Sequence, residues 1–255
     1  MRHGLAILLA ASALFAGSAA RADAIWTDAN IVTGLDVSGS IDSDEADIQV
    51  DGIAMAIRSP EIVAAIQTGR FGRIGFAVFA WADRSYPVLV SWRLISSSQD
   101  ALEASAEVAS RLRMILRSDV AGQIGMLTDL SGAIDYGGGM LRGAPFATDH
   151  PILNIVGNGI DNVGEGAAPA RDRLVARGVT INGVALGYDH SIYEYYHREV
   201  IGGPTAFVLA ANDPSKLVDV LARKFATEIV FNIDPAHPIR NRSDQSARWL
   251  AASSQ

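Results

Sequence analysis

The sequence predicts a three-layer α/β domain, in which helices cover both faces of a doubly wound, mostly parallel sheet with one antiparallel edge strand. Two observations support this fold class. Apolar strand-like runs alternate with helical patterns along most of the 255 residues, and the runs are almost continuously apolar, as strands buried on both faces are. Residues 73–81 and 86–94 are two such runs separated by only four residues, which predicts a hairpin and therefore the antiparallel strand.

Each strand is expected where an apolar run is bounded by turn residues. The run at 151–156, for example, ends at the turn formed by Gly157, Asn158 and Gly159. In chain order, the expected strands are residues 30–36, 73–81, 86–94, 151–156, 179–186 and 206–210. Ligands of doubly wound sheets bind beyond the carboxyl ends of the strands, so the residues that follow these ends are the first candidates for function.

Helix boundaries follow from capping and breaking residues. Asp42 and, three residues later, Glu45 have the pattern of a capping box, and Ser59-Pro60 ends this helix near Arg58. The other helices are expected up to about residue 68 and at about residues 99–116, 129–141, 169–177, 191–200 and 214–229.

The first 22 residues have the pattern of a secretory signal peptide. Arg2 and His3 precede an apolar run at residues 5–16, and a small-x-small pattern ends at Ala22. We therefore expect cleavage after Ala22 and a periplasmic or secreted protein with no stable membrane span. The alternative is an uncleaved N-terminal anchor, which the short apolar run disfavours. We expect one domain at residues 23–232 and a polar, proline-containing tail at residues 233–255.

Composition excludes several classes of function. The formal net charge is −7 and no run of basic residues is present, which argues against nucleic-acid binding. The chain has no cysteine, so it forms neither disulfides nor thiolate metal sites. Hydrophobic residues make up 49% of the chain, enough for the core of one large domain.

Asp36, Ser38 and Ser40 follow the first predicted strand at a spacing of two. Carboxylate and hydroxyl oxygens are hard ligands suited to Mg²⁺, Mn²⁺ or Ca²⁺, and Gly39 lets the loop turn tightly. The alternative is that the two serines only satisfy backbone groups ahead of the next helix.

Residues 35–40 (LDVSGS) resemble the metal-ion-dependent adhesion site of von Willebrand factor A domains. More narrowly, residues 30–229 look like a family of exported bacterial A-like proteins of uncharacterised role. Three further segments carry that similarity: residues 128–134 (TDLSGAI), 178–183 (GVTING) and 200–204 (VIGGP). The resemblance implies that Thr128 in a second loop and Asn158 in a third loop join the metal ligands. The complete implied set is Asp36, Ser38, Ser40, Thr128 and Asn158.

One position departs from the family pattern. An aspartate is expected in the third loop, and this chain has Asn158 instead. An amide oxygen can still ligate a cation but carries no charge, so affinity for a hard dication should fall. Asp161 and Asp129 are the two nearby carboxylates that could restore the charge, and their positions cannot be predicted from the sequence alone.

The resemblance implies a non-enzymatic binding module, which holds Mg²⁺ (or Mn²⁺ or Ca²⁺) and binds a protein partner whose acidic side chain completes the metal coordination. Two alternatives stay open. One is a structural or interaction domain whose site is degenerate and free of metal. The other is a serine hydrolase built on Ser38, which is disfavoured because the Gly-x-Ser-x-Gly pattern is not present there.

Overall fold

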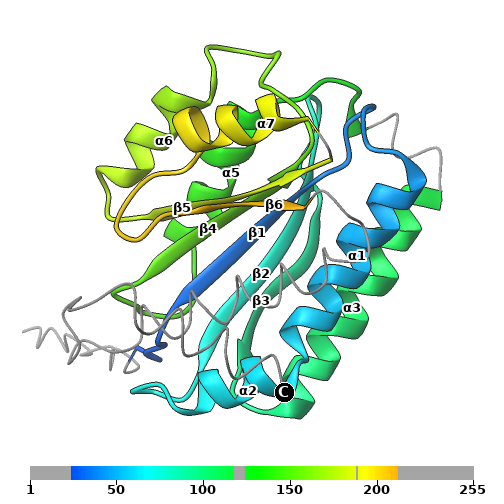
Figure 1. Cartoon of the computed structure of the whole chain (residues 1–255). Helices are drawn as coiled ribbons and strands as arrows, with labels where there is room; N and C mark the ends of the chain where they lie inside the picture. The colour runs from blue at the N-terminus through cyan, green and yellow to red at the C-terminus, as the bar shows by residue number, and fades with distance from the viewer. Residues whose placement is uncertain (1–23, 118–123, 188, 212–255) are drawn as a thin grey trace, which may run out of the picture.

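The computed structural model describes residues 24–117, 124–187 and 189–211 (Figure 1). The predicted signal peptide at residues 1–22, the predicted helix at 214–229 and the predicted tail at 233–255 lie outside the described residues. No helix among the described residues is both long enough and apolar enough to cross a membrane.

Six strands in the described part of the chain form one sheet with the order β3-β2-β1-β4-β5-β6. Their bounds are β1 Asn30–Asp36, β2 Ile74–Trp81, β3 Val88–Ile95, β4 Pro151–Gly157, β5 Thr180–Leu186 and β6 Val208–Ala211. All neighbouring strands are parallel except β2 and β3, which pair antiparallel at the edge. The predicted fold class is therefore confirmed.

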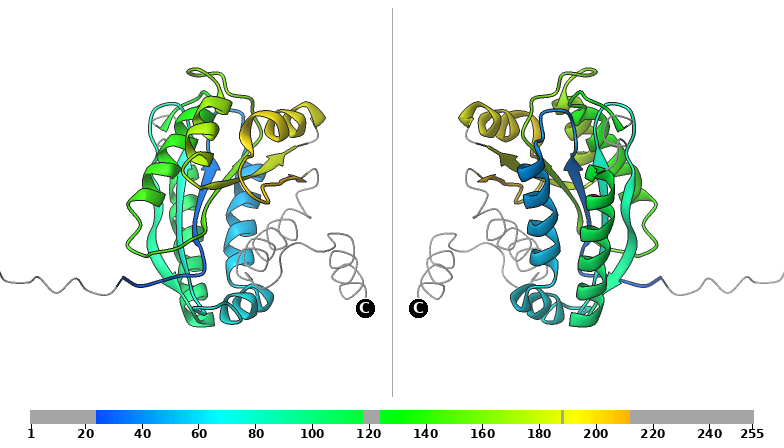
Figure 2. Two further views of the ribbon diagram at one scale, coloured as in Figure 1. Left: turned by 90° about the vertical axis from the view of Figure 1, so that its left-hand side faces the viewer. Right: turned by 90° about the vertical axis from the view of Figure 1, so that its right-hand side faces the viewer.

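Helices cover both faces of this sheet (Figures 1 and 2). Helices α1, α2 and α3 pack on one face, and α5, α6 and α7 pack on the other. Their bounds are α1 Ser43–Ile57, α2 Pro60–Gln67, α3 Ser98–Arg117, α5 Leu130–Arg142, α6 Ala167–Val175 and α7 His190–Tyr195. The predicted helix at 191–200 is not α-helical throughout, because a π-helical turn, η1 (Tyr196–Val200), follows α7.

The central strand β1 lies between β2 and β4, so the order of the strands reverses at β1. This is the switch point at which doubly wound sheets bind their ligands. Every residue of β1 is buried, and successive side chains alternate between the two faces. Ile31 and Leu35 belong to the core under α1, whereas Val32 belongs to the core under α5. Asp36 has the same parity as Val32, so its carboxylate points to the α5 and α7 side.

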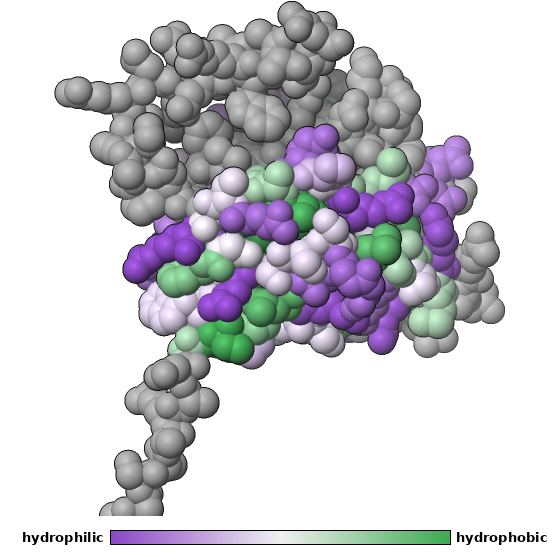
Figure 3. All heavy atoms as spheres, turned by 90° about the horizontal axis from the view of Figure 1, so that it is seen from below, coloured by the Kyte–Doolittle hydropathy of each residue, from purple (hydrophilic) through white to green (hydrophobic). Residues whose placement is uncertain are grey.

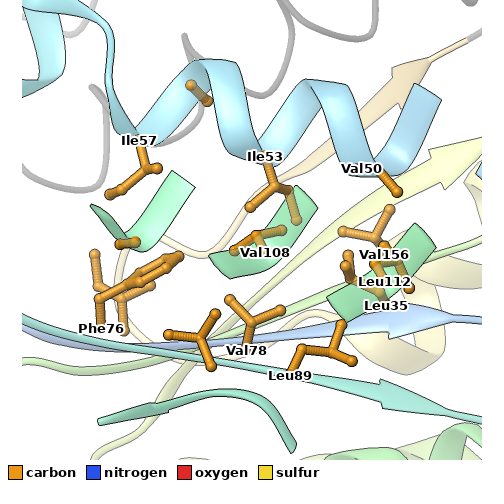
Figure 4. Close-up of a cluster of buried hydrophobic side chains, with 14 of the residues drawn as sticks. Leu35, Val50, Ile53, Ile57, Phe76, Val78, Leu89, Val108, Leu112 and Val156 are labelled. Carbon is orange, nitrogen blue, oxygen red and sulfur yellow. The ribbon is translucent and has the colours of Figure 1, made fainter. Parts of the chain in front are cut away.

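Packing between α1 and the sheet fixes the position of this helix. Ile53 and Ile57 on α1 are fully buried against Phe76 and Val78 of β2 and against α3 (Figure 4). The predicted capping box at its start is present, since the Asp42 carboxylate accepts from the Glu45 amide at 2.8 Å and Glu45 Oε2 accepts from the Asp42 amide at 3.3 Å. The first turn of α1 is thus held rigidly at the carboxyl end of β1.

Candidate functional site

Three loops meet at the carboxyl end of the sheet. The first loop, residues 36–42, follows β1. The second loop, residues 125–129, precedes α5, and the third loop, residues 157–163, follows β4. These loops contain all five residues that the resemblance to A domains implies.

Hydrogen bonds tie the three loops together. The Gly39 amide of the first loop donates to the Met126 carbonyl of the second at 3.1 Å. Between the second and third loops, the Asn162 amide donates to the Thr128 carbonyl at 3.0 Å, and the Thr128 amide donates to Asn162 Oδ1 at 2.9 Å. The relative positions of the candidate ligands are therefore set by hydrogen bonds between the loops.

Asp36 is the most deeply buried of these residues, with no exposed surface. Its Oδ1 accepts from the Ser38 amide at 2.8 Å, and its backbone carbonyl accepts from Gln49 Nε2 of α1 at 3.1 Å. Its Oδ2 is buried and has no hydrogen-bond partner. A buried carboxylate oxygen without a donor is costly, so this atom marks a place where a ligand, water or ion would be stabilising.

The hydroxyl groups of the first loop connect to the third loop. Ser38 Oγ and Ser40 Oγ lie 3.1 Å apart, and Ser40 Oγ donates to Asn158 Oδ1 at 2.7 Å. Ser38 is buried, whereas Ser40 is exposed. The chain of oxygen atoms therefore runs from the protein interior to its surface.

Thr128 joins this group from the second loop. It is only 5% exposed, and its Oγ1 lies 2.9 Å from the position that a Cβ on Gly159 would occupy. A side chain at position 159 would collide with this hydroxyl, so glycine lets the second and third loops approach each other. The structure thus brings Ser38, Ser40 and Asn158 into one hydrogen-bonded chain and holds Thr128 beside the residue that follows Asn158.

Burial raises the pKa of Asp36 to about 6, because desolvation disfavours the carboxylate. The hydrogen bond from the Ser38 amide and the proximity of the Ser38 hydroxyl and the Asn158 backbone amide act in the opposite direction and lower it. The negative charge of Glu45 adds a smaller contribution that raises it. A cation beside Asp36 would reverse this balance.

Unsatisfied polar groups gather around Asp36. In the described part of the chain, four buried side-chain atoms have no hydrogen-bond partner: Asp36 Oδ2, Gln49 Oε1, Trp81 Nε1 and Tyr196 OH. Gln49 bonds the Asp36 carbonyl, and Trp81 lies opposite Asp36 in the pairing of β1 with β2. Orphaned buried groups are rare in native proteins, and a bound water or ion is one physical explanation for them.

No motif in the sequence singles out Tyr196 as a site residue. It is fully buried in η1. Its OH and Asp36 Oδ2 each lie 2.7 Å from the position that a Cβ on Gly157 would occupy. The two atoms therefore face the same small space, which exists because residue 157 has no side chain. The signal that points to Tyr196 is the π-helical turn, which is visible only in the structure. Such turns often occur at functional sites.

Asp129 and Asp161, the two candidates for an additional charge, have other partners. Asp129 caps α5, and its carboxylate accepts from Tyr86 OH at 2.5 Å and from Ser131 Oγ at 3.0 Å. The Asp161 carboxylate accepts from the backbone amides of Ser131 at 3.0 Å and Val163 at 3.1 Å. Both carboxylates connect segments of the second and third loops and the start of α5 through hydrogen bonds.

Glu45 is a residue near the site that sequence reasoning treated only as a helix cap. Its Oε2 accepts from Asn158 Nδ2 at 2.9 Å, and Asn158 Nδ2 also donates to the Ser40 carbonyl at 3.1 Å. Glu45 and Gln49 are four residues apart and so share one face of α1. This spacing, at the start of the helix that follows Asp36, Ser38 and Ser40, is the feature of the sequence that could have indicated a role for Glu45 at the site.

No three His, Cys, Asp or Glu side chains within the described ranges form a group that could hold a metal ion. A cation bound here would depend on hydroxyl and amide oxygens in addition to carboxylate. The histidines of the α7 region are engaged at the surface: His190 pairs with Glu194 at 3.2 Å and stacks on Tyr193, and His197 stacks on the same ring.

Solved structures share this architecture. Proximal thread matrix protein 1 (PTMP1) from the mussel byssus, described with a zinc-occupied MIDAS motif, is 16% identical with a TM-score of 0.57, and the match covers 81% of this chain and 49% of that one. The von Willebrand factor domain of Mfa5, a type V pilus tip protein of Porphyromonas gingivalis, is 9% identical with a TM-score of 0.57, covering 85% of this chain and 99% of that one. The pilus adhesin SpaC from Lactobacillus rhamnosus GG is 11% identical with a TM-score of 0.56, and the match covers 83% of this chain and 31% of that one.

The sheet order, its antiparallel edge strand and these matches define a von Willebrand factor A-like fold, and the resemblance drawn from the sequence is confirmed. The chain spans about half of the length of PTMP1, at 49%. Residues 26–233 match the family described as Protein of unknown function (DUF1194), and the chain belongs to this family. Curated proteins give no match.

Proposed function

We propose that this domain is an exported, non-enzymatic binding module, which holds a divalent cation between its three loops and captures a protein partner through that cation. The observation that carries the proposal is the unpartnered, fully buried Oδ2 of Asp36 at the switch point of the sheet. The export part rests on the signal-peptide pattern of residues 1–22 and on the pilus proteins that share the fold.

The donor set fits a hard cation. We assign Asp36, Ser38, Ser40, Thr128 and Asn158 to the site, and their oxygen atoms suit Mg²⁺ first and Mn²⁺ or Ca²⁺ next. The zinc-occupied MIDAS motif of PTMP1 makes a divalent cation reasonable in this fold, and oxygen ligands favour a harder ion here. The cation would supply a positive charge that attracts an incoming carboxylate.

The site has a side that faces solvent. Ser40 is exposed at the outer end of the hydroxyl chain, so a cation held there could accept a ligand from outside. Because Asp36 is the only carboxylate in the assigned set, the cation would keep much of its charge. We therefore propose that the partner contributes an acidic side chain to the coordination.

Exposed apolar side chains lie on the two loops that carry Thr128 and Asn158. Met126 and Leu127 of the second loop are 58% and 48% exposed, and Ile160 of the third loop is 45% exposed. We name these three residues the apolar rim. The end of the molecule seen in Figure 3 has hydrophilic and hydrophobic residues intermixed instead. A carboxylate flanked by apolar side chains is the partner chemistry that complements a cation inside such a rim.

Calorimetry and thermal unfolding of the chain from residue 23 onward test the proposal. We expect Mg²⁺ or Mn²⁺ to bind and to raise the melting temperature, and we expect Asp36→Asn to abolish both effects. Asp47→Asn is the matched control, since it removes one carboxylate from the exposed side of the same region. Wild-type protein that binds none of Mg²⁺, Mn²⁺ and Ca²⁺ at millimolar concentration would overturn the proposal.

A metal-free interaction domain is the second candidate. It is favoured by one observation: the Asn158 amide is satisfied by Ser40 and Glu45, so these hydrogen bonds hold the first and third loops together without a cation. The same titration separates the two candidates. Partner binding that is unaffected by a chelator would favour this second function.

A further inference from the structure

The third-loop position that carries aspartate in the A-domain pattern is Asn158 in this chain, and its amide has a defined orientation. Asn158 Nδ2 faces two acceptors, Glu45 Oε2 at 2.9 Å and the Ser40 carbonyl at 3.1 Å. Asn158 Oδ1 faces the Ser40 hydroxyl at 2.7 Å. The reverse orientation would put an amide oxygen against a carboxylate, so Glu45 fixes which atom of Asn158 faces the site.

From these contacts we propose that Glu45 supplies the second negative charge of the cation site, acting through the Asn158 amide. The Glu45–Asn158 pair would then replace the single third-loop carboxylate of the A-domain pattern. This inference rests on the proposed function, since it concerns the same cation. The independent observation that points to a cation is Asp36 Oδ2, which is buried and unpartnered beside the third loop.

The physical basis is polarisation along a hydrogen-bonded chain. A carboxylate that accepts from one end of an amide increases the negative charge on the oxygen at the other end. Asn158 Oδ1 is therefore a stronger acceptor beside Glu45 than it would be alone. The charge of Glu45 also reaches Asp36 directly, because it contributes to the raised pKa of that carboxyl.

Helix α1 holds Glu45 in this position. Its carboxylate closes the capping box with Asp42, and negative charge in the first turn of a helix is favoured by the helix dipole. One turn later, Gln49 of the same helix donates to the Asp36 carbonyl. One face of α1 therefore contacts both the first and the third loop, so Glu45 is a positioning residue.

If the third-loop aspartate of the A-domain pattern were simply missing here, Asn158→Asp would strengthen cation binding. A role for Glu45 predicts a different result. Asn158→Asp should fail to strengthen cation binding, because the new carboxylate would lie against Glu45 in place of an amide hydrogen bond. Glu45→Gln should weaken Mg²⁺ or Mn²⁺ binding by about 10-fold, the range found for partners behind metal ligands. Combining Glu45→Gln with Asn158→Asp should return the affinity toward the wild-type value.

Titration of Mn²⁺ and Mg²⁺ into these three variants and wild type, together with thermal unfolding in a chelator, is the test. Glutamine is accepted at the third position of a capping box, so Glu45→Gln should keep α1 and the melting temperature without cation. Asn158→Asp should lower that melting temperature, and the double variant should regain it. This second readout does not depend on a bound ion.

The outcomes separate this inference from the proposed function. If wild type binds and Glu45→Gln matches the Asp47→Asn control, Glu45 supplies no charge to the site and only this inference is overturned. If Asn158→Asp alone binds more tightly than wild type, the pair does not act as a unit and the inference is likewise overturned. If wild type does not bind, both proposals are overturned together.

Discussion

Two groups of carboxylates lie at the same end of the sheet and differ in how they are satisfied. On the second and third loops, Asp129 and Asp161 accept hydrogen bonds from Tyr86, Ser131 and backbone amides. On the first loop, Asp36 is more deeply buried and keeps one oxygen without a partner. The satisfied carboxylates shape the loops, and the unsatisfied one is where a cation would be stabilising.

The carboxylates also differ in what they contribute to the stability of the folded protein. Asp129 contributes to stability because it caps α5 and accepts a hydrogen bond from Tyr86. Burial of the Asp36 charge instead costs stability in the absence of a cation. Substitution of Asp36 should therefore raise the stability of the metal-free protein and abolish cation binding. Substitution of Asp129 should lower stability and affect cation binding much less.

The largest expected effect concerns Asp36 and pH. Its folded pKa is raised from 3.8 to about 6, so the folded protein binds more protons than the unfolded chain between these values. Without cation, the stability that this group contributes is complete below pH 3.8 and is lost as pH rises through about 6. The loss should amount to about 3 kcal/mol. Urea unfolding in a chelator across this range measures it.

Asp36→Asn is the corresponding substitution. It should remove this pH dependence and leave the metal-free protein more stable than wild type at pH 7. Asp47→Asn, as the exposed control, should change neither property. A stability curve of Asp36→Asn that still parallels wild type between pH 4 and 6 would show that the Asp36 charge is not buried at a cost.

The second effect concerns Asp129. Asp129→Ala should destabilise the protein by about 2 kcal/mol, because α5 loses its cap and Tyr86 loses its acceptor. Cation affinity should change much less than in Asp36→Asn. A double-mutant cycle with Tyr86→Phe isolates the hydrogen bond between the two side chains. If Asp129→Ala loses cation binding without losing stability, Asp129 belongs to the cation site and does not differ from Asp36 in its role.

The difference between these two groups was only partly predictable from the sequence. The fold class and the strand that ends at Asp36 follow from the alternation of apolar runs and from the position of the motif. The roles of Asp129 and Asp161 depend on hydrogen bonds to Tyr86 and Ser131, which no spacing in the sequence specifies. The burial of Tyr196 beside the site depends on the π-helical turn η1, which has no clear sequence pattern.

A third, smaller effect is expected at Tyr196, whose OH faces the same small space as Asp36 Oδ2. Tyr196→Phe removes a buried hydroxyl that has no partner, so it should stabilise the metal-free protein by about 1 kcal/mol. Chemical denaturation in a chelator measures the change, and Tyr193→Phe on the partly exposed part of α7 is the control. A loss of stability in Tyr196→Phe would mean that its OH donates to Asp36 Oδ2 in solution, and the orphaned oxygen would no longer distinguish the two groups.

The smallest effect on stability is expected at the apolar rim. Leu127→Ser and Ile160→Ser should change stability by less than about 0.5 kcal/mol, because both side chains are largely exposed. Neither side chain is in the assigned ligand set, so Mg²⁺ affinity should stay unchanged in calorimetry. Proteins that the wild-type domain retains from an envelope extract with Mg²⁺ and releases on chelation should bind both variants more weakly. Equal retention by wild type and both variants would show that the partner contacts the cation without the rim.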